Sequence, residues 1–156
     1  MKKLFLTLIL AVLTGLLFAG CTVPAVPPNG DSAETEEAEM YLTINKNKIK
    51  VTLAENSSVR ALVEILEEGD IVYTANDYGG FEKVGDLGHT LPTVDTQITT
   101  QAGDVILYNG NQIVLFYGSN SWRYTRLGKI EGYSVSELRS LLCAGEGSVQ
   151  VTISLK

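Results

Sequence analysis

The sequence holds few of the residues that usually carry chemistry. In 156 residues there are one histidine (His89), one tryptophan (Trp122) and two cysteines. A lone histidine in a polar Gly-His-Thr loop, without a second histidine or a cysteine nearby, does not form a metal site. Cys21 and Cys143 lie in segments of different character, so a disulfide framework is not expected. We predict no metal and no cofactor.

Positively charged residues are also scarce, and this limits the kinds of partner that the protein is expected to bind. The net charge is −6 at pH 7, which argues against a nucleic acid bound through its phosphates. A phosphate-binding glycine motif is absent. Ser119 and Ser121 have no histidine partner in the sequence, so no catalytic nucleophile is implied. With 45% hydrophobic residues, the chain can still build one domain with a sizeable core.

The N-terminus has the layout of a signal peptide. Lys2 and Lys3 precede an apolar run, which ends in small residues and is shorter than the roughly 20 residues that span a membrane. The four residues Phe-Ala-Gly-Cys that end at Cys21 resemble a bacterial lipobox, although the family usually has leucine in place of the phenylalanine. The resemblance implies a signal peptide over residues 1–20 and a lipid on Cys21. The protein would then be anchored at the extracytoplasmic face of the cell membrane. The alternative is a secretory signal that is cut nearby and leaves an ordinary thiol.

Residues 21–39 are predicted to form a tether. Three of the four prolines lie here, and five acidic residues follow them without a basic one. Such a segment cannot fill a core and is typical of an extended, self-repelling linker. A solvated spacer is favoured over a metal site, because flexible carboxylates do not preorganise one. The domain over residues 40–156 is expected to fold without the tether.

The spacing of apolar residues divides that domain into predicted strands and helices. Alternation in MYLTINKNKIKVTL predicts a hairpin with its turn at Asn45–Asn47, and GDVILYNGNQIVLFYG predicts a second hairpin around Asn109-Gly110. Further strands are predicted over DIVYTAND, WRYTRLGKI and SVQVTISLK, while YGGFEKVGDLGHTLPT is interpreted as strand fragments and loop. Leu115 and Tyr117 share one face of their strand, and Phe116 lies on the other.

Two helices complete the pattern. SSVRALVEILEEG has helical spacing, with Ser57 or Ser58 as the N-cap and Gly69 at the end. YSVSELRSLL begins with a Ser134–Glu137 capping box. Its predicted buried stripe is Val135, Leu138, Leu141 and Leu142, and Cys143 is interpreted as a small buried apolar group. A strand-rich chain with two helices favours a mainly β fold, a closed or nearly closed antiparallel barrel with the helices at its open ends.

The order of these elements resembles that of cyclophilin. MYLTINKNKIKVTLAENSSVRALVEIL is similar to the family's opening hairpin and first helix, and RLGKIEGYSVSELRSL to its second helix. The closer resemblance is to bacterial and archaeal cyclophilin-like proteins, carried by DYGGFEKVGDL, GDVILY, IVLFYGSNSW and YTRLGKI. It covers residues 40–156 and implies the cyclophilin-like fold, a closed antiparallel β-barrel of about eight strands with two capping helices.

The cyclophilin catalytic motif is missing. In that family an arginine after Phe-His polarises the prolyl nitrogen, but this sequence has no Phe-His-Arg and no arginine between Arg60 and Arg123. A lysine cannot replace the planar guanidinium fork. The sequence therefore favours a noncatalytic module for a peptide or small ligand. The alternative is a divergent peptidyl-prolyl isomerase or another enzyme on the same barrel.

Several residues are candidates for the ligand site. They are aromatic or charged side chains near the turns: Tyr78, Phe81, Glu82, His89, Tyr117, Trp122 and Arg126. Each has a structural alternative. Trp122 fits a barrel rim or a core equally, Arg126 suits an ion pair with a carboxylate at a helix end, and His89 suits a solvated loop. The glycines beside Tyr78 fit either a close ligand approach or a barrel bulge.

Overall fold

The computed structural model describes residues 38–156, so the signal peptide, Cys21 and most of the tether lie outside the described residues. The elements follow in the order β1 (Met40–Ile44), β2 (Asn47–Leu53), α1 (Ser57–Glu68), β3 (Ile71–Tyr78), β4 (Glu82–Asp86), β5 (Thr96–Thr99), β6 (Asp104–Tyr108), β7 (Gln112–Phe116), β8 (Ser121–Ile130), α2 (Val135–Leu141) and β9 (Ser148–Leu155). No helix in this range is long and apolar enough to cross a membrane.

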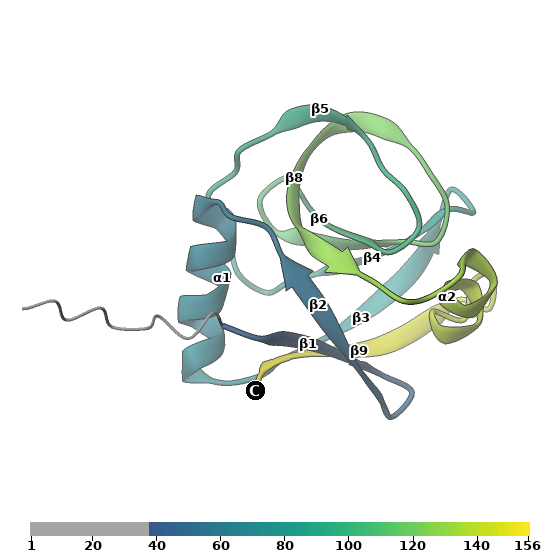
Figure 1. The fold of residues 1–156 in the computed structure, drawn as a ribbon, viewed down its shortest axis with the longest axis horizontal. Coiled ribbons are helices and arrows are strands. Elements are labelled where there is room, and N and C mark those ends of the chain that lie inside the picture. Colours follow the sequence, from purple (N-terminus) through teal and green to yellow (C-terminus); the bar gives the residue numbers. More distant parts are fainter. Residues whose placement is uncertain (1–37) are drawn as a thin grey trace, which may run out of the picture. The chain divides into compact units, whose positions relative to one another are not determined.

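The strands form a closed antiparallel barrel. Their order is β2-β1-β9-β3-β4-β7-β6-β8, and a pairing between β2 and β8 closes the ring of eight. The ninth strand, β5, pairs with the first half of β8 outside this ring (Figure 1). The predicted mainly β barrel is therefore confirmed, with one outer strand in addition.

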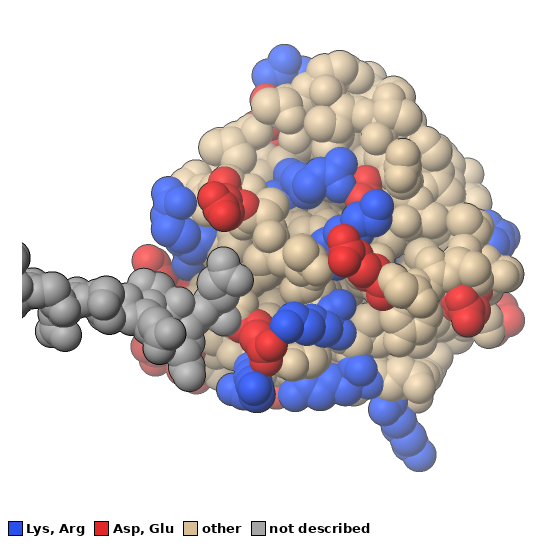
Figure 2. Space-filling view, in the orientation of Figure 1, with Lys and Arg blue, Asp and Glu red and all other residues tan. Residues whose placement is uncertain are grey.

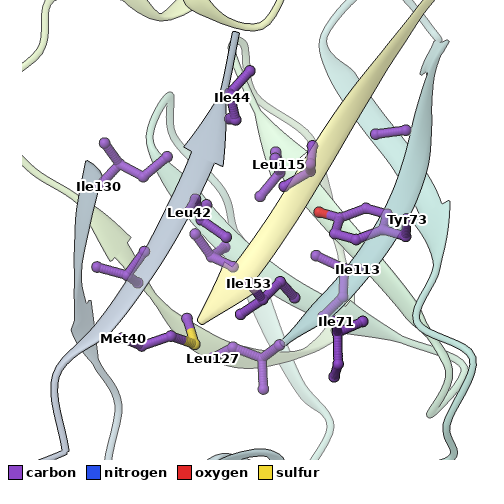
Figure 3. Packing of buried hydrophobic residues seen from close by; sticks show 14 of the residues in the cluster. Met40, Leu42, Ile44, Ile71, Tyr73, Ile113, Leu115, Leu127, Ile130 and Ile153 are labelled. Carbon is purple, nitrogen blue, oxygen red and sulfur yellow. The ribbon is translucent and has the colours of Figure 1, made fainter. Parts of the chain in front are cut away.

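Alternation along the strands fills the barrel interior. Leu42, Leu115 and Ile153 come from three different strands and point into the same space (Figure 3). The two helices lie on opposite sides of the barrel in Figure 1, and both contribute side chains to the interior cluster: Val59, Leu62 and Leu66 from α1, and Leu138 from α2. One continuous core thus joins strands and helices.

Both hairpin turns use left-handed backbone. Asn109 and Gly110 have φ of 51° and 77°, as the predicted type I′ turn requires. In the first hairpin Asn45 and Lys46 have φ of 47° and 69°, and Asn47 already belongs to β2. The first turn is therefore one residue shorter than predicted.

The start of α1 differs from the prediction. Asn56 is the N-cap, and its side-chain oxygen accepts a hydrogen bond from the Val59 amide at 3.0 Å. Ser58 instead donates to the Pro92 carbonyl at 2.5 Å. Asparagine and serine are similar caps, and the tertiary contact of Ser58 decided between them. Gly69 follows the helix as predicted.

The second helix has the predicted Ser134–Glu137 capping box, but its buried stripe is narrower. Leu138 and Leu142 are buried, whereas Val135 is 55% exposed. Cys143 is half-buried, and its sulfur accepts a hydrogen bond from Asn45 at 3.1 Å. With seven residues, α2 packs on the barrel through only part of the face that its spacing suggested.

The glycine-rich segment over residues 78–93 contains one strand, β4, and β5 follows it in a stretch for which the sequence predicted no strand. β4 lies between β3 and β7, and β5 lies outside the barrel. A Cβ at Gly85 in β4 would come within 2.4 Å of the Tyr73 ring, so this glycine lets the ring lie inside the barrel. Short strands with charged or exposed residues have no clear alternation, which explains why the sequence showed only fragments here.

Charge is mixed over the surface of the domain. On the face in Figure 2, lysine and arginine lie beside aspartate and glutamate without a continuous patch of either sign. Glu39, which the sequence assigned to the tether, accepts a hydrogen bond from Tyr41 at 3.0 Å and pairs with Lys50 at 2.5 Å. The side-chain contacts of the barrel thus begin one residue before Met40.

Candidate functional site

A second apolar cluster lies on the outside of the barrel. Phe116 on β7 belongs to it, while its neighbours Leu115 and Tyr117 belong to the interior cluster, as the predicted alternation requires. The buried members of the outer cluster are Ile106, Val114, Phe116 and Tyr124. These outward positions are buried because β8 carries Tyr124 beside them and β5 adds Ile98, which packs against the cluster.

A pocket of about 410 Å³ opens beside this outer cluster. Strands β4, β6, β7 and β8, the end of β3, and the loop before β8 supply its lining: Tyr78, Glu82, Val84, Tyr108, Gln112, Val114, Asn120, Trp122 and Tyr124. Four of these nine residues are aromatic, and one is acidic. This volume is in the range of small-molecule sites.

Glu82 is the charged residue of the pocket. It is 5% exposed, and its Oε2 atom has no hydrogen-bond partner within residues 38–156. Burial raises the pKa of Glu82 to about 7, because the charged form loses water. Along β4 the next residue, Lys83, is also buried but pairs elsewhere. Within the described range, no three histidine, cysteine, aspartate or glutamate residues are placed to hold a metal ion.

The back wall of the pocket is built from packed rings. Tyr124 makes edge-to-face contacts with Tyr108 and with Phe116, each at 5.8 Å between ring centroids. Phe81 in turn stacks on Phe116 at 6.3 Å. The hydroxyl of Tyr124 accepts a hydrogen bond from the Asn120 side-chain amide at 2.9 Å. These contacts hold the Tyr124 ring and hydroxyl in place before a ligand enters.

The pocket rim is exposed but anchored. Tyr78 and Trp122 are 66% and 56% exposed, so both present large apolar surfaces to solvent. The loop before Trp122 is tied to Thr100, whose amide donates to the Asn120 carbonyl at 2.8 Å and whose hydroxyl accepts from the Asn120 amide at 2.9 Å. Trp122 itself lies in the β5–β8 pairing, opposite Ile98.

The structure brings three of the seven candidate residues together. Tyr78, Glu82 and Trp122 line the pocket. Phe81 is half-buried in the ring stack behind it, and His89 is exposed in the loop after β4. The remaining two, Tyr117 and Arg126, have structural partners elsewhere.

Arg126 forms an ion pair with Asp104 at 2.5 Å. An ion pair was expected, but with a carboxylate at a helix end, and Asp104 begins strand β6 instead. Asp104 is buried and also accepts a hydrogen bond from the Gln101 amide at 2.9 Å. Arg126 therefore fastens β8 to β6 and does not line the pocket.

Tyr117 faces the interior, where it closes a polar network. Its hydroxyl donates to Asp77 at 2.9 Å, and the Lys83 ammonium pairs with the same carboxylate at 2.9 Å. The amides of Gly145 and Gly147 also donate to Asp77. Burial opposes ionisation of Asp77, but these donors outweigh it and hold its pKa well below the ordinary value. Burial and Asp77 together raise the pKa of Tyr117 to about 12.

The remaining pocket residues were not anticipated from the sequence: Val84, Tyr108, Gln112, Val114, Asn120 and Tyr124. Tyr108 and Gln112 flank the Asn109-Gly110 turn and pair directly, so a hairpin register would have placed them side by side. Tyr124 shares a strand face with Trp122. No pattern in the local sequence indicated that part of the outer surface of the barrel would be covered by another strand.

Comparison with known proteins decides the family. The sequence profile of the cyclophilin-like family matches residues 42–154. The chain belongs to this family. The solved structures that resemble this cyclophilin-like domain include the following two. The hypothetical protein AF2241 from Archaeoglobus fulgidus has a TM-score of 0.56 at 17% identity, over 76% of this chain and 95% of that one. McbB, solved in complex with tryptophan, has a TM-score of 0.55 at 14% identity, over 75% of this chain and 44% of McbB. No curated protein matches the sequence.

Glu82 should make the stability of the cyclophilin-like domain fall as the pH rises. The pKa of Glu82 is raised from an ordinary 4.5 to about 7, so between these values the folded state binds more protons than the unfolded state. Its contribution is greatest below pH 4.5 and is lost as the pH rises through 7. Glu82→Gln should therefore change the free energy of unfolding more favourably at pH 8 than at pH 4.5. We expect the two changes to differ by about 1–3 kcal/mol. Urea unfolding at both pH values measures this, and an equal effect at both would contradict it.

Proposed function

We propose that this chain is a lipid-anchored, extracytoplasmic cyclophilin-like domain that binds a peptide or small ligand without catalysing a reaction. The observation that carries the proposal is the pocket on the outer barrel face. It combines a preformed aromatic wall, two exposed rim aromatics and one buried acidic side chain. Concave, mostly apolar sites with a few fixed polar groups are the usual form of ligand sites.

The composition of the pocket favours binding over proline isomerisation. Among the described residues, the nine that line it include no arginine, and Arg126 is held by Asp104. The acidic Glu82 would not polarise a prolyl nitrogen in the way that a guanidinium does. The second candidate function, a divergent isomerase, rests on the same concave aromatic face with a different polarising group.

Trp122 provides a direct test of binding. It is the only tryptophan of the chain and lines the pocket, so its fluorescence reports on this site alone. We expect a saturable change in Trp122 emission when a library of short peptides and small aromatic compounds is titrated into the full-length chain. Tyr124→Ala should weaken these changes, because it removes the back wall. Ligands whose affinity is unaffected by Tyr124→Ala would place the binding site elsewhere.

The isomerase alternative is tested separately. In a protease-coupled proline-isomerisation assay, we expect the full-length chain to show no rate above background. Turnover that disappears in both Glu82→Gln and Tyr124→Ala would overturn the noncatalytic proposal and place an enzyme in the same pocket. Arg60→Ala serves as a control, because this side chain is exposed on α1 and lies outside the pocket lining.

The anchor is proposed from the lipobox-like sequence that ends at Cys21. Two or more acyl chains hold a protein stably on a membrane, since each buried methylene contributes about 0.8 kcal/mol. After expression in a bacterium, we expect the protein in the membrane fraction with a mass increase on Cys21. Cys21→Ser should move it to the soluble fraction without that increase. Membrane association and an unchanged mass in Cys21→Ser would contradict the anchor.

A further inference from the structure

We infer that the pocket recognises a protonated primary amine, with Glu82 as its carboxylate partner and the pocket aromatics around its cation. The inference rests on the proposed function, because it names the chemical class of ligand for that same pocket. The amine can belong to a lysine side chain of a peptide or to a free small molecule.

Glu82 lacks the groups that usually accompany a buried carboxylate. It is 5% exposed, and its Oε2 atom has no hydrogen-bond donor in the described part of the chain. A buried carboxylate costs free energy unless a donor or cation compensates it. Asp77, by comparison, has a lysine, a tyrosine and two backbone amides as donors. The contrast indicates that the partner of Glu82 comes from outside the domain.

No cation of the described domain is placed to fill that role. Lys83 is next in sequence but points to the other face of β4, where it pairs with Asp77 and donates to the Gly147 carbonyl at 2.6 Å. Arg126 is engaged by Asp104. Lysine, arginine and histidine are absent from the pocket lining as the structure describes it. A cationic ligand would therefore meet no repulsion there.

The walls of the pocket suit a cation as well. Tyr78, Tyr108, Trp122 and Tyr124 all line it, and the faces of tyrosine and tryptophan rings attract ammonium groups. Trp122 and Tyr78 form the exposed rim through which a ligand enters. A primary amine fits better than a quaternary one, because Oε2 lacks a hydrogen bond and, of the two, only the primary amine has an N–H to donate.

Glu82 is the group around the pocket that changes charge near neutral pH. The titratable groups that face it are phenols: Tyr78 from β3, Tyr108 from β6 and Tyr124 from β8. Burial, and then Glu82 itself, raises the pKa of Tyr124 above its ordinary value. The other polar lining residues, Gln112 and Asn120, do not titrate.

The charged groups on the far side of β3, β4 and β7 keep their state over the same range. Asp77 is ionised and paired with Lys83, and Tyr117 has a pKa of about 12. An alkylamine stays protonated until about pH 10. Binding should therefore tighten between pH 5 and pH 8, as Glu82 loses its proton.

The experiment compares three matched probes by Trp122 fluorescence on the full-length chain. Phenethylammonium carries a charge and N–H donors, N,N,N-trimethylphenethylammonium carries the charge alone, and phenethyl alcohol is neutral. At pH 8 we expect the primary amine to bind about tenfold more tightly than the alcohol, a difference of about 1.4 kcal/mol, with the trimethyl compound between them. At pH 5 this preference should shrink. A short peptide with an acetylated N-terminus and one lysine with a free ε-amino group, compared with its norleucine counterpart, shows whether the amine can come from a peptide.

Two variants assign the effect to Glu82. Glu82→Gln keeps the shape of the side chain and should abolish the preference for the amine while the alcohol still binds. Glu64→Gln removes an exposed carboxylate from α1 and should change nothing. Equal affinity for amine and alcohol in the wild type would overturn the inference and leave the proposed binding function standing. A preference that persists in Glu82→Gln, or that is unchanged from pH 5 to pH 8, would also overturn it. If none of the probes changed Trp122 emission, the inference would fail, and the peptide titration described above would test the broader function by itself.

Discussion

Asp77→Ala is expected to destabilise the barrel by about 3–5 kcal/mol, the usual cost of leaving a buried charge without its partner. The Lys83 side chain is 0% exposed, and Asp77 is its carboxylate partner at 2.9 Å. The substitution also removes the acceptor for Tyr117 and for the amides of Gly145 and Gly147. Urea unfolding at pH 7 measures the loss of free energy.

A double variant separates the unpaired charge from lost packing. Asp77→Ala combined with Lys83→Met removes both ions and keeps much of the volume of the lysine stem. We expect it to recover part of the stability, because no unpaired ion remains in the interior.

The pKa of Asp77 in the folded protein lies below its ordinary value. The stabilisation that ionised Asp77 provides is therefore fully present above the ordinary pKa and is lost as the pH falls toward the lower, folded-state pKa. A loss of less than about 1 kcal/mol in Asp77→Ala would show that Lys83 reaches water in solution.

The second large effect is expected for Phe116→Ala, at about 3–5 kcal/mol. Phe116 is 1% exposed and holds the outer cluster through its contacts with Phe81 and Tyr124. Its removal leaves a cavity directly behind the pocket wall. We expect urea unfolding to show the loss, and ligand-induced changes in Trp122 fluorescence to weaken with it.

Trp122→Ala is the matched comparison. Trp122 is 56% exposed, so its loss should cost well under about 3 kcal/mol, the lower limit that we expect for a core aromatic residue. Ligand binding should fall strongly, and calorimetric titration measures it because this variant has no tryptophan. Phe116→Ala and Trp122→Ala together distinguish a core aromatic residue from a rim aromatic residue within one stretch of sequence. If Trp122→Ala were as destabilising as Phe116→Ala, Trp122 would be a structural residue and the pocket would lose its rim.

The barrel could be predicted from the sequence because its elements are encoded locally. The alternation in β1, β2 and β9, the Asn109-Gly110 turn and the Ser134–Glu137 capping box each involve residues that are neighbours along the chain. Local periods of two and 3.6 residues report which face a core will cover. The opposite directions of Leu115 and Phe116 followed from this rule alone.

The errors arose where local signals compete or are weak. Asn56 and Ser58 are both acceptable caps, and only the contact of Ser58 with Pro92 assigned the cap to Asn56. Val135 has the right spacing for burial, but no element of the described domain covers it enough to bury it. β5 has four residues, none of them buried, and its pairing depends on the first half of β8, which extends past the barrel.

The pocket was decided by the tertiary structure. Tyr78, Glu82 and Trp122 were candidates from their residue types, but about 40 residues separate Glu82 from Trp122, and no local period connects them. They meet because β4 pairs with β7 while the first half of β8 extends beyond the barrel to pair with β5. Sequence by itself determined which face is apolar in the strands that alternate clearly, such as β1, β2 and β9. The order and curvature of strands far apart in the chain determined which outward face is covered, and therefore that Glu82 is buried there without a partner.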